Sequence, residues 1–176
     1  MESIFQKYYS PESFHDRFAD DKTDAVDVII PVIHTNELWE KNLISYYREI
    51  PINRLLISDG GCIDNSLEIL NKFPRVTILD HRTFTSLGYS LKKLIEETKT
   101  EWFIYLHSDV YLPGGWFEVM KKNKAQYDWY ECRQQITALV EYPLDYTNLT
   151  RPFSGSQMGR SAILKEATKK IDDDFL

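Results

Sequence analysis

Polar residues that could hold a metal or a phosphorylated ligand follow an unbroken apolar run in the second half of the chain. Trp102 to Leu106 are all apolar or aromatic, and His107, Ser108 and Asp109 come directly after them. A carboxylate such as Asp109 suits Mg²⁺ or Mn²⁺, whereas an imidazole such as His107 suits Mn²⁺ and other transition metals better than Mg²⁺. The alternative is that Asp109 only caps the turn before Pro113, where Asp is a common residue.

Two further groups of polar or turn residues follow apolar runs in the same way. Asp59-Gly60-Gly61 comes after the run that ends at Ser58, and His34-Thr35-Asn36 comes after the run 26–33. A carboxylate at Asp59 could accept hydrogen bonds from a base or a ribose, and the two glycines allow a backbone to approach a flat ligand closely. The sequences Gly-x-x-x-x-Gly-Lys and Gly-x-Gly-x-x-Gly do not occur. Their absence argues against nucleotide hydrolases of the phosphate-loop type and against dinucleotide-dependent dehydrogenases.

The elements that position these groups alternate between strand and helix. We predict strands at 26–33, 54–58, 76–79 and 102–106. They are followed respectively by a helix at 37–49 (capped by Asn36), one that ends at 72 (capped by Asp64 or Asn65), one at 85–98 and one at 116–124. This alternation is typical of an α/β fold with a mostly parallel central sheet flanked by helices, Rossmann-like in organisation. Strand ends in such a sheet meet at one crevice, where ligands bind. Beyond Tyr127 the pattern weakens: 129–140 is expected to contain strands, antiparallel ones among them, 142–150 a loop and 161–170 a helix.

Composition limits the partners and the location of the chain. Its 176 residues carry a net charge of −6, and no run of Lys and Arg exceeds two residues. Nucleic-acid binding is therefore not expected, and an acidic chain that binds an anionic ligand needs a cation. The two cysteines, Cys62 and Cys132, indicate reduced thiols rather than a disulfide framework. We expect a cytoplasmic protein, with a place at the cytoplasmic membrane face left open, because neither a signal peptide nor an apolar span is visible.

Segments in four regions of the chain resemble inverting family 2 glycosyltransferases of the GT-A fold. Their sequences are DVIIPVIHTNE (27–37), LISDGGCIDNSLEIL (56–70), EWFIYLHSDV with LPGGW (101–116), and FSGSQ with RSAIL and IDDDF (153–175). The resemblance runs from about residue 26 to the end of the chain. It implies a GT-A-like nucleotide-diphospho-sugar transferase domain over 26–176, preceded by an N-terminal arm or short helix over 1–25.

The resemblance also implies roles for individual residues. Pro31, Val32 and Ile33 match the loop that cradles the nucleotide, and Asp59 matches the residue that hydrogen-bonds the base. Asp109 matches the last residue of the Asp-x-Asp motif, which binds a divalent metal, Mn²⁺ or Mg²⁺, on the diphosphate, and Ser108 lies inside that motif. Arg82 and Lys92 are weaker candidates for contact with the diphosphate.

The chain departs from the family pattern at two places. His107 stands where the motif has its first Asp, and two roles stay open for it: metal ligand, or neutral side chain without a ligand. The catalytic carboxylate of the family follows the equivalent of 171–176, so we expect the acceptor and catalytic-base segment to be missing from this chain. Asp172, Asp173 and Asp174 are the remaining candidate bases, although an acidic run of this kind is most simply a solvated turn.

These observations lead to two functional hypotheses and disfavour a third. The first is transfer of a sugar, with inversion, from a UDP-, GDP- or dTDP-sugar to the hydroxyl of a glycan, lipid or protein acceptor. The second is a catalytically impaired nucleotide-sugar-binding or scaffolding domain, acting as a homo-oligomer or with a partner subunit. A sugar-1-phosphate nucleotidyltransferase is disfavoured, because no glycine-rich and basic loop follows residues 26–33.

Overall fold

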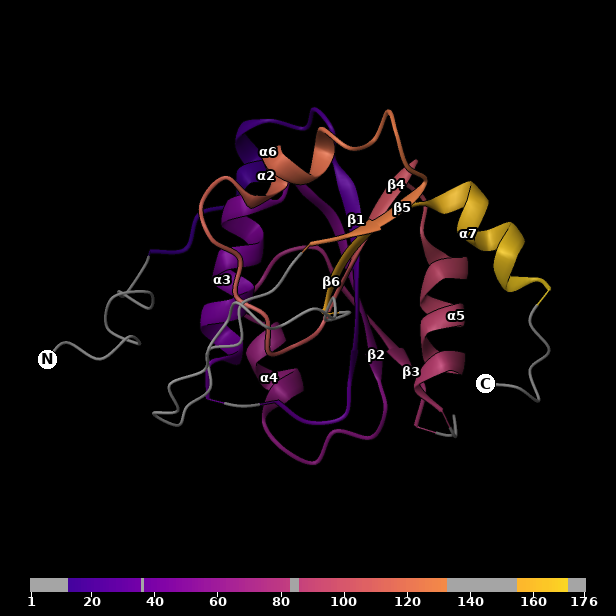
Figure 1. The fold of residues 1–176 in the computed structure, drawn as a ribbon. Helices are drawn as coiled ribbons and strands as arrows, with labels where there is room; N and C mark the ends of the chain where they lie inside the picture. The colour runs from indigo at the N-terminus through magenta and orange to yellow at the C-terminus, as the bar shows by residue number, and fades with distance from the viewer. Residues whose placement is uncertain (1–12, 36, 83–85, 133–154, 171–176) are drawn as a thin grey trace, which may run out of the picture.

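A six-stranded sheet with helices on both faces forms the described part of the chain (Figure 1). The structure, a computed structural model, describes residues 13–35, 37–82, 86–132 and 155–170. Its strands are β1 (Val26–Val32), β2 (Ile52–Asp59), β3 (Val76–Asp80), β4 (Trp102–Leu106), β5 (Trp129–Glu131) and β6 (Ser156–Arg160). Its helices are α2 (Arg17–Asp20), α3 (Trp39–Glu49), α4 (Ser66–Leu70), α5 (Leu87–Glu97), α6 (Trp116–Lys121) and α7 (Ser161–Thr168). Among these helices, none combines the length and the apolar character needed to cross a bilayer.

The strands lie in the order β3-β2-β1-β4-β6-β5. The first four are parallel, and β6 runs antiparallel to both of its neighbours, β4 and β5. The predicted α/β fold with a mostly parallel sheet is thus confirmed. The carboxyl ends of β1, β2, β3 and β4 meet at one edge, which the amino end of β6 also joins.

Alternate strand residues pack against helices on opposite faces, because successive side chains of a strand point to opposite sides. Figure 1 shows α3, α4 and α6 on one side of the sheet and α5 and α7 on the other. The larger apolar cluster joins the first group of helices to Val28, Ile30, Leu55, Ile57 and Ile104. The smaller cluster joins α5 and α7 to Ile29, Leu56, Phe103 and Tyr105. Both faces of the central strands are therefore buried, which explains their unbroken apolar runs.

The predicted elements are found with small changes in their ends. The helix expected from residue 37 begins at Trp39, and the one expected to reach 124 ends at Lys121. Asn36, the expected loop 142–150 and most of the expected strand region 129–140 lie outside the described residues. Strand β6 was not predicted, because its sequence, Ser-Gln-Met-Gly-Arg, has no apolar alternation and contains a glycine, which weakens a strand.

Glycine at position 159 is required by the packing of β6 against its neighbours. A methyl group there would lie 2.5 Å from Cε3 of Trp129 and 3.3 Å from Cε1 of Phe103. We expect Gly159→Ala to lower the free energy of unfolding by about 1–3 kcal/mol through overpacking. Gly114→Ala is the control, because nothing lies within 4 Å of its added methyl group. Denaturant unfolding of the two variants checks this, and equal stabilities would contradict it.

Candidate functional site

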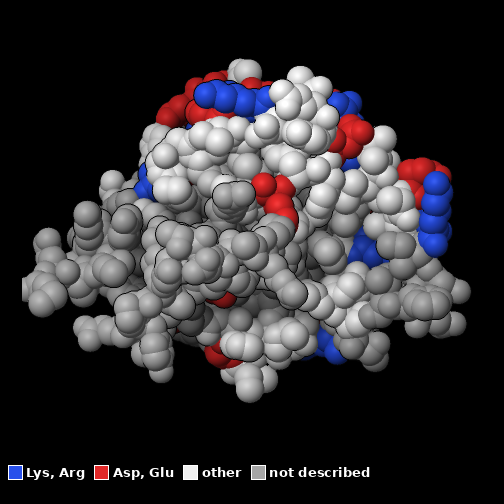
Figure 2. Space-filling view, viewed as in Figure 1, with Lys and Arg blue, Asp and Glu red and all other residues white. Residues whose placement is uncertain are grey.

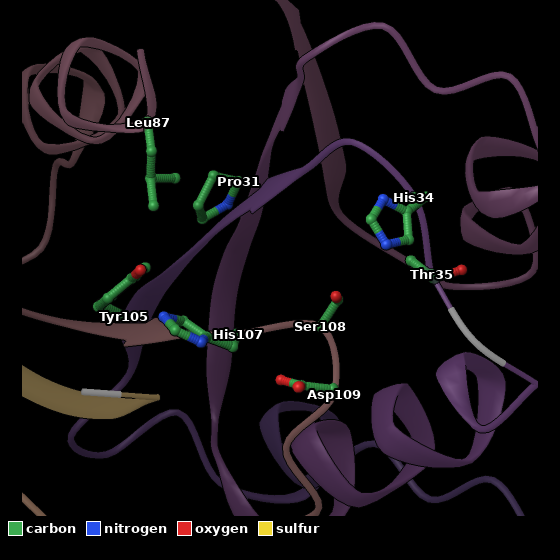
Figure 3. A pocket seen from close by; sticks show the side chains of 8 residues that line it. All are labelled: Pro31, His34, Thr35, Leu87, Tyr105, His107, Ser108 and Asp109. Atoms are coloured by element: carbon green, nitrogen blue, oxygen red, sulfur yellow. The ribbon is translucent and has the colours of Figure 1, made fainter. Parts of the chain in front are cut away.

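A cleft of about 320 Å³ opens at the carboxyl ends of β1 and β4 (Figure 3). Its lining comes from the end of β1 and the loop after it, from β4 and the loop after it, and from the first residue of α5. The lining residues are Pro31, His34, Thr35, Leu87, Tyr105, His107, Ser108 and Asp109. Two of the polar groups that follow separate strands in the sequence therefore share one cavity.

Asp109 presents its carboxylate to the cleft. The residue is exposed and makes no hydrogen bond or ion pair with another described residue. Figure 3 shows the carboxylate pointing toward His107. Within the described ranges, no group of three His, Cys, Asp or Glu side chains could enclose a metal ion. A cation held by Asp109 would thus need further oxygen ligands from the bound molecule and from water, as is usual for Mg²⁺ on phosphates.

Tyr105 forms part of the cleft floor beside His107. The two rings meet edge to face, with centroids 5.2 Å apart. Burial, together with the negative charge of Asp109, raises the pKa of the Tyr105 hydroxyl to about 12. The phenol therefore stays protonated at neutral pH and can donate a hydrogen bond.

Polar side chains of α3 hold the backbone of the loop that follows β4. Asn42 Nδ2 donates to the carbonyl oxygen of Ser108 at 2.9 Å. The hydroxyl of Tyr46 bridges the carbonyl oxygens of His107, at 2.9 Å, and Val110, at 2.6 Å. These bonds satisfy carbonyl groups on either side of Asp109, so they fix the direction in which its side chain leaves the backbone.

The next turn of α3 holds the second half of the same loop. Ser45 Oγ accepts from the amide of Leu112 at 3.1 Å, and Arg48 Nη2 donates to the carbonyl of Leu112 at 2.7 Å. Glu49 Oε2 accepts from the amide of Gly115 at 2.7 Å. Residues 107–115, which we name the β4 loop, are thus tied to one helix along most of their length.

The loop after β1 is held by residues that follow β2. The amide of Thr35 donates to Asp64 Oδ2 at 3.0 Å, and its hydroxyl lies 2.8 Å from that of Ser66. The indole of Trp39 donates to the carbonyl of Ser66 at 3.1 Å. These contacts set the position of His34 and Thr35 at the rim of the cleft.

Asp59 lies at the end of β2, in register with Val32 of β1. Its Oδ1 accepts from the amides of Gly61 at 2.9 Å and Cys62 at 2.8 Å. Burial alone would raise the pKa of Asp59, but the backbone N–H groups of Cys62 and Gly61 outweigh it and hold the pKa below its usual value. Asp59 is therefore ionised, and its second oxygen is not used by these amides.

Contacts with the two neighbouring strands, β1 and β3, hold the backbone at Asp59 and Gly60. A methyl group on Gly60 would lie 2.8 Å from Cγ1 of Ile33 and 3.2 Å from the carbonyl oxygen of Val32, so only glycine allows this approach. On the other side, the amide of His81 donates to the carbonyl of Asp59 at 2.9 Å. Burial lowers the pKa of the His81 ring, whose Nδ1 lies 2.6 Å from the Ser58 hydroxyl.

The structure places the predicted site residues in two sets. Pro31, His107, Ser108 and Asp109 line the cleft. Val32, Ile33, Asp59, Arg82 and Lys92 are not among its lining residues: Val32 is buried at the end of β1, Ile33 is 62% exposed, and Lys92 lies within α5. Arg82 pairs with Asp80, and its Nε lies 3.9 Å from Asp59 Oδ2. Asp172, Asp173 and Asp174 lie outside the described residues.

Four lining residues are not among the site residues predicted from the sequence. His34 and Thr35 belong to a polar group that follows a predicted strand, and Tyr105 precedes His107 by two positions. Because a strand repeats every two residues, that spacing puts Tyr105 on the same face as His107 and was an available signal. Leu87 comes from a helix start, and nothing in its local sequence indicates a place in the cleft.

Charged groups are mixed on the described part of the surface in Figure 2. Lys121 and Lys124 both contact Asp24, at 3.3 and 3.2 Å, and Arg160 contacts Asp128 at 2.9 Å. The described part of this face shows no continuous basic patch, in keeping with the net charge of −6.

A comparison with protein families finds one match that spans more than half of the chain. The model described as "Glycosyl transferase family 2" matches residues 27–130. These residues include all of the cleft-lining residues as well as Asp59 and α3. No curated protein matches the chain significantly.

Solved structures with the same fold are similar in shape but distant in sequence. Residues 1–349 of TarS from S. aureus give a TM-score of 0.62 at 15% identity, covering 84% of this chain and 50% of that one. The mannosyltransferase PcManGT from Pyrobaculum calidifontis, in complex with GDP-Man and Mn²⁺, gives 0.64 at 14% identity, covering 84% and 48%. A 4-diphosphocytidyl-2C-methyl-D-erythritol synthase from Anaerococcus prevotii gives 0.60 at 12% identity, covering 88% and 82%. The chain thus spans about half the length of TarS 1–349 and of the mannosyltransferase, and the likeness shows the fold alone.

Removing the Tyr46 hydroxyl is expected to loosen the β4 loop. Tyr46→Phe leaves the carbonyls of His107 and Val110 without this donor, and should lower the free energy of unfolding by about 1–3 kcal/mol. Amide hydrogen exchange within residues 107–112 should become faster. The matched control is Tyr47→Phe, which removes an equally buried hydroxyl that donates instead to the carbonyl of Pro74. Equal exchange rates of the β4 loop in the two variants would contradict its attachment to α3.

Proposed function

The chain belongs to glycosyl transferase family 2, and we propose that it binds a nucleoside-diphosphate sugar in the cleft and transfers the sugar to an acceptor hydroxyl. The observation that carries this proposal is the Asp109 carboxylate, which faces the cleft without a described partner and is held in place by the β4 loop. An acidic group in this position repels a diphosphate unless a cation lies between them. The site therefore suits a ligand that arrives together with a divalent metal.

The nucleotide is proposed to lie across the ends of β1 and β2. Asp59 is ionised there and has one oxygen left to accept from a base or a ribose. Pro31 offers an apolar surface in the cleft, and the backbone at Val32 and Gly60 is close-packed beneath it. UDP-, GDP- and dTDP-sugars are the proposed donors. The complex of the mannosyltransferase neighbour with GDP-Man supports this class of ligand.

Asp109 is the residue that we propose as the protein ligand of the metal, with His107 as a second candidate beside it. One carboxylate with phosphate and water oxygens is a common set for Mg²⁺ or Mn²⁺, and an imidazole would favour Mn²⁺. A bound cation would offset the charge of the departing nucleoside diphosphate. The Mn²⁺ in the mannosyltransferase complex supports the presence of a divalent metal in this proposal.

Inversion requires a carboxylate that takes the proton from the acceptor hydroxyl as that hydroxyl attacks the anomeric carbon. Asp172, Asp173 and Asp174 are proposed as candidates for this base. The acceptor is proposed to be the hydroxyl of a glycan, lipid or protein, and the protein is proposed to work in the cytoplasm or at its membrane face.

Binding of a nucleoside diphosphate with Mn²⁺ should raise the melting temperature of the protein. At a ligand concentration of about 100 times Kd, binding adds about 2.7 kcal/mol, which corresponds to about 5–10 °C for a domain of this size. Asp109→Ala should remove most of this shift, because the cation loses its protein ligand. Thermal unfolding with UDP, GDP and dTDP, each with Mn²⁺, Mg²⁺ or EDTA, measures it.

Asp20→Ala is the control, since it removes another exposed carboxylate that does not line the cleft. It should leave the metal-dependent shift unchanged. No shift with any nucleotide and either metal would overturn the proposal. If nucleotides bind but a panel of sugar nucleotides gives neither transfer nor donor hydrolysis, the transfer step of the proposal fails and only binding remains.

A further inference from the structure

A row of polar side chains runs from Tyr105, which lines the cleft, to two residues of β6 and β5 that lie outside its lining. Tyr105 of β4 lies opposite Gln157 of β6, which in turn lies opposite Glu131 of β5. Directly opposed residues of antiparallel strands point to the same face of a sheet. Tyr105 belongs to the apolar cluster on the α5 face, so Gln157 and Glu131 stand on that face as well.

At this row the side chains on the α5 face of the sheet change from aromatic to polar. One step further from the cleft, the same strands present Phe103, Gly159 and Trp129, with the two rings 6.0 Å apart. At the cleft edge the same three strands present a phenol, an amide and a carboxylate instead. The α5 face therefore turns from aromatic to polar at the edge where the cleft opens.

Each of the three polar side chains has a hydrogen-bonding atom that no other described residue uses. Gln157 Nε2 donates to Glu131 Oε2 at 3.3 Å. The side-chain carbonyl of Gln157, the second Glu131 oxygen and the Tyr105 hydroxyl make no bond to another described residue. Gln157 and Tyr105 are only 8% and 4% exposed. A ligand that donates and accepts hydrogen bonds could use the capacity that these side chains keep.

We infer that Tyr105, Gln157 and Glu131 bind the hydroxyl groups of the transferred sugar and set the preference among donor sugars. This inference rests on the proposed function. A nucleotide at the ends of β1 and β2, with its diphosphate at Asp109, directs the sugar toward β4 and β6, where the row begins. Phenol, amide and carboxylate together supply donors and acceptors, and a sugar hydroxyl is both.

The experiment compares each nucleoside diphosphate with its sugar nucleotide by calorimetry in the presence of Mn²⁺. UDP, GDP and dTDP are paired with UDP-glucose, UDP-galactose, UDP-GlcNAc, GDP-mannose and dTDP-glucose. The best pair for the wild-type protein is then measured on Tyr105→Phe, Gln157→Met and Glu131→Gln. Each variant should raise the Kd of the sugar nucleotide about 5- to 10-fold, the value expected for loss of one hydrogen bond, and leave the Kd of the diphosphate within about twofold.

A second readout separates recognition from a structural role. Discrimination between sugar nucleotides that differ at one hydroxyl group should narrow in Gln157→Met, which an altered fold would not produce selectively. Tyr130→Phe is the matched control, because its hydroxyl serves Met120 and Met158 on the opposite face. This variant should change neither Kd, and thermal unfolding shows which variants stay folded.

The outcomes separate this inference from the proposed function. If the wild-type protein binds neither diphosphates nor sugar nucleotides, the proposed function itself fails. If it binds both but the three variants weaken neither, or weaken both equally, the inference is overturned while the nucleotide site stands. Selective weakening of the sugar nucleotide by at least two of the three variants supports it.

Discussion

The attachment of the β4 loop to α3 is the constraint on which the candidate site depends. A loop that turns back over a sheet edge exposes backbone groups that the sheet no longer pairs, and buried backbone groups without partners are costly. Here Asn42, Ser45, Tyr46, Arg48 and Glu49 supply those partners from successive turns of one helix. These bonds hold the backbone of the loop in one conformation. That conformation sets the directions in which the side chains of His107, Ser108 and Asp109 point at the cleft.

This arrangement also explains why α3 carries polar residues at buried positions. Asn42 and Ser45 are almost fully buried, and Glu49 is only 6% exposed. The helix uses these positions to hold the loop instead of for apolar packing, while Trp39, Leu43 and Tyr47 supply the packing. The arrangement leaves the Asn42 side-chain carbonyl without a partner among the described residues. An unpaired buried carbonyl is unfavourable, so this one group offsets part of the stability that the hydrogen bonds between α3 and the loop contribute.

The sequence predicted which strands end at the cleft edge of the sheet better than it predicted which residues line the cleft. Apolar runs located β1, β2 and β4, and the rule that parallel strand ends meet was enough to bring Pro31 and Asp109 together. Tyr105 was missed because the sequence shows it only as part of an apolar run, although its hydroxyl lies in the cleft. The role of Asn42 and Tyr46 was missed because their partners lie more than 60 residues away in the chain, and helical periodicity carries no information about such pairs. Strand β6 was missed for a similar reason, since Gly159 is explained by its contacts with Trp129 and Phe103 on the two neighbouring strands.

His107 changes the electrostatics of the cleft relative to a motif with two carboxylates. Asp109 is the only carboxylate among the described residues that line the cleft, so the protein offers one negative charge to a cation instead of two. Phosphate oxygens of a donor would then supply a larger share of the ligand charge, and a cation would bind more weakly to the protein alone than to the protein with its nucleotide. The edge-to-face contact with Tyr105 limits how the His107 ring can turn. The imidazole is thereby held against the cleft floor, between the proposed diphosphate position at Asp109 and the polar row that begins at Tyr105.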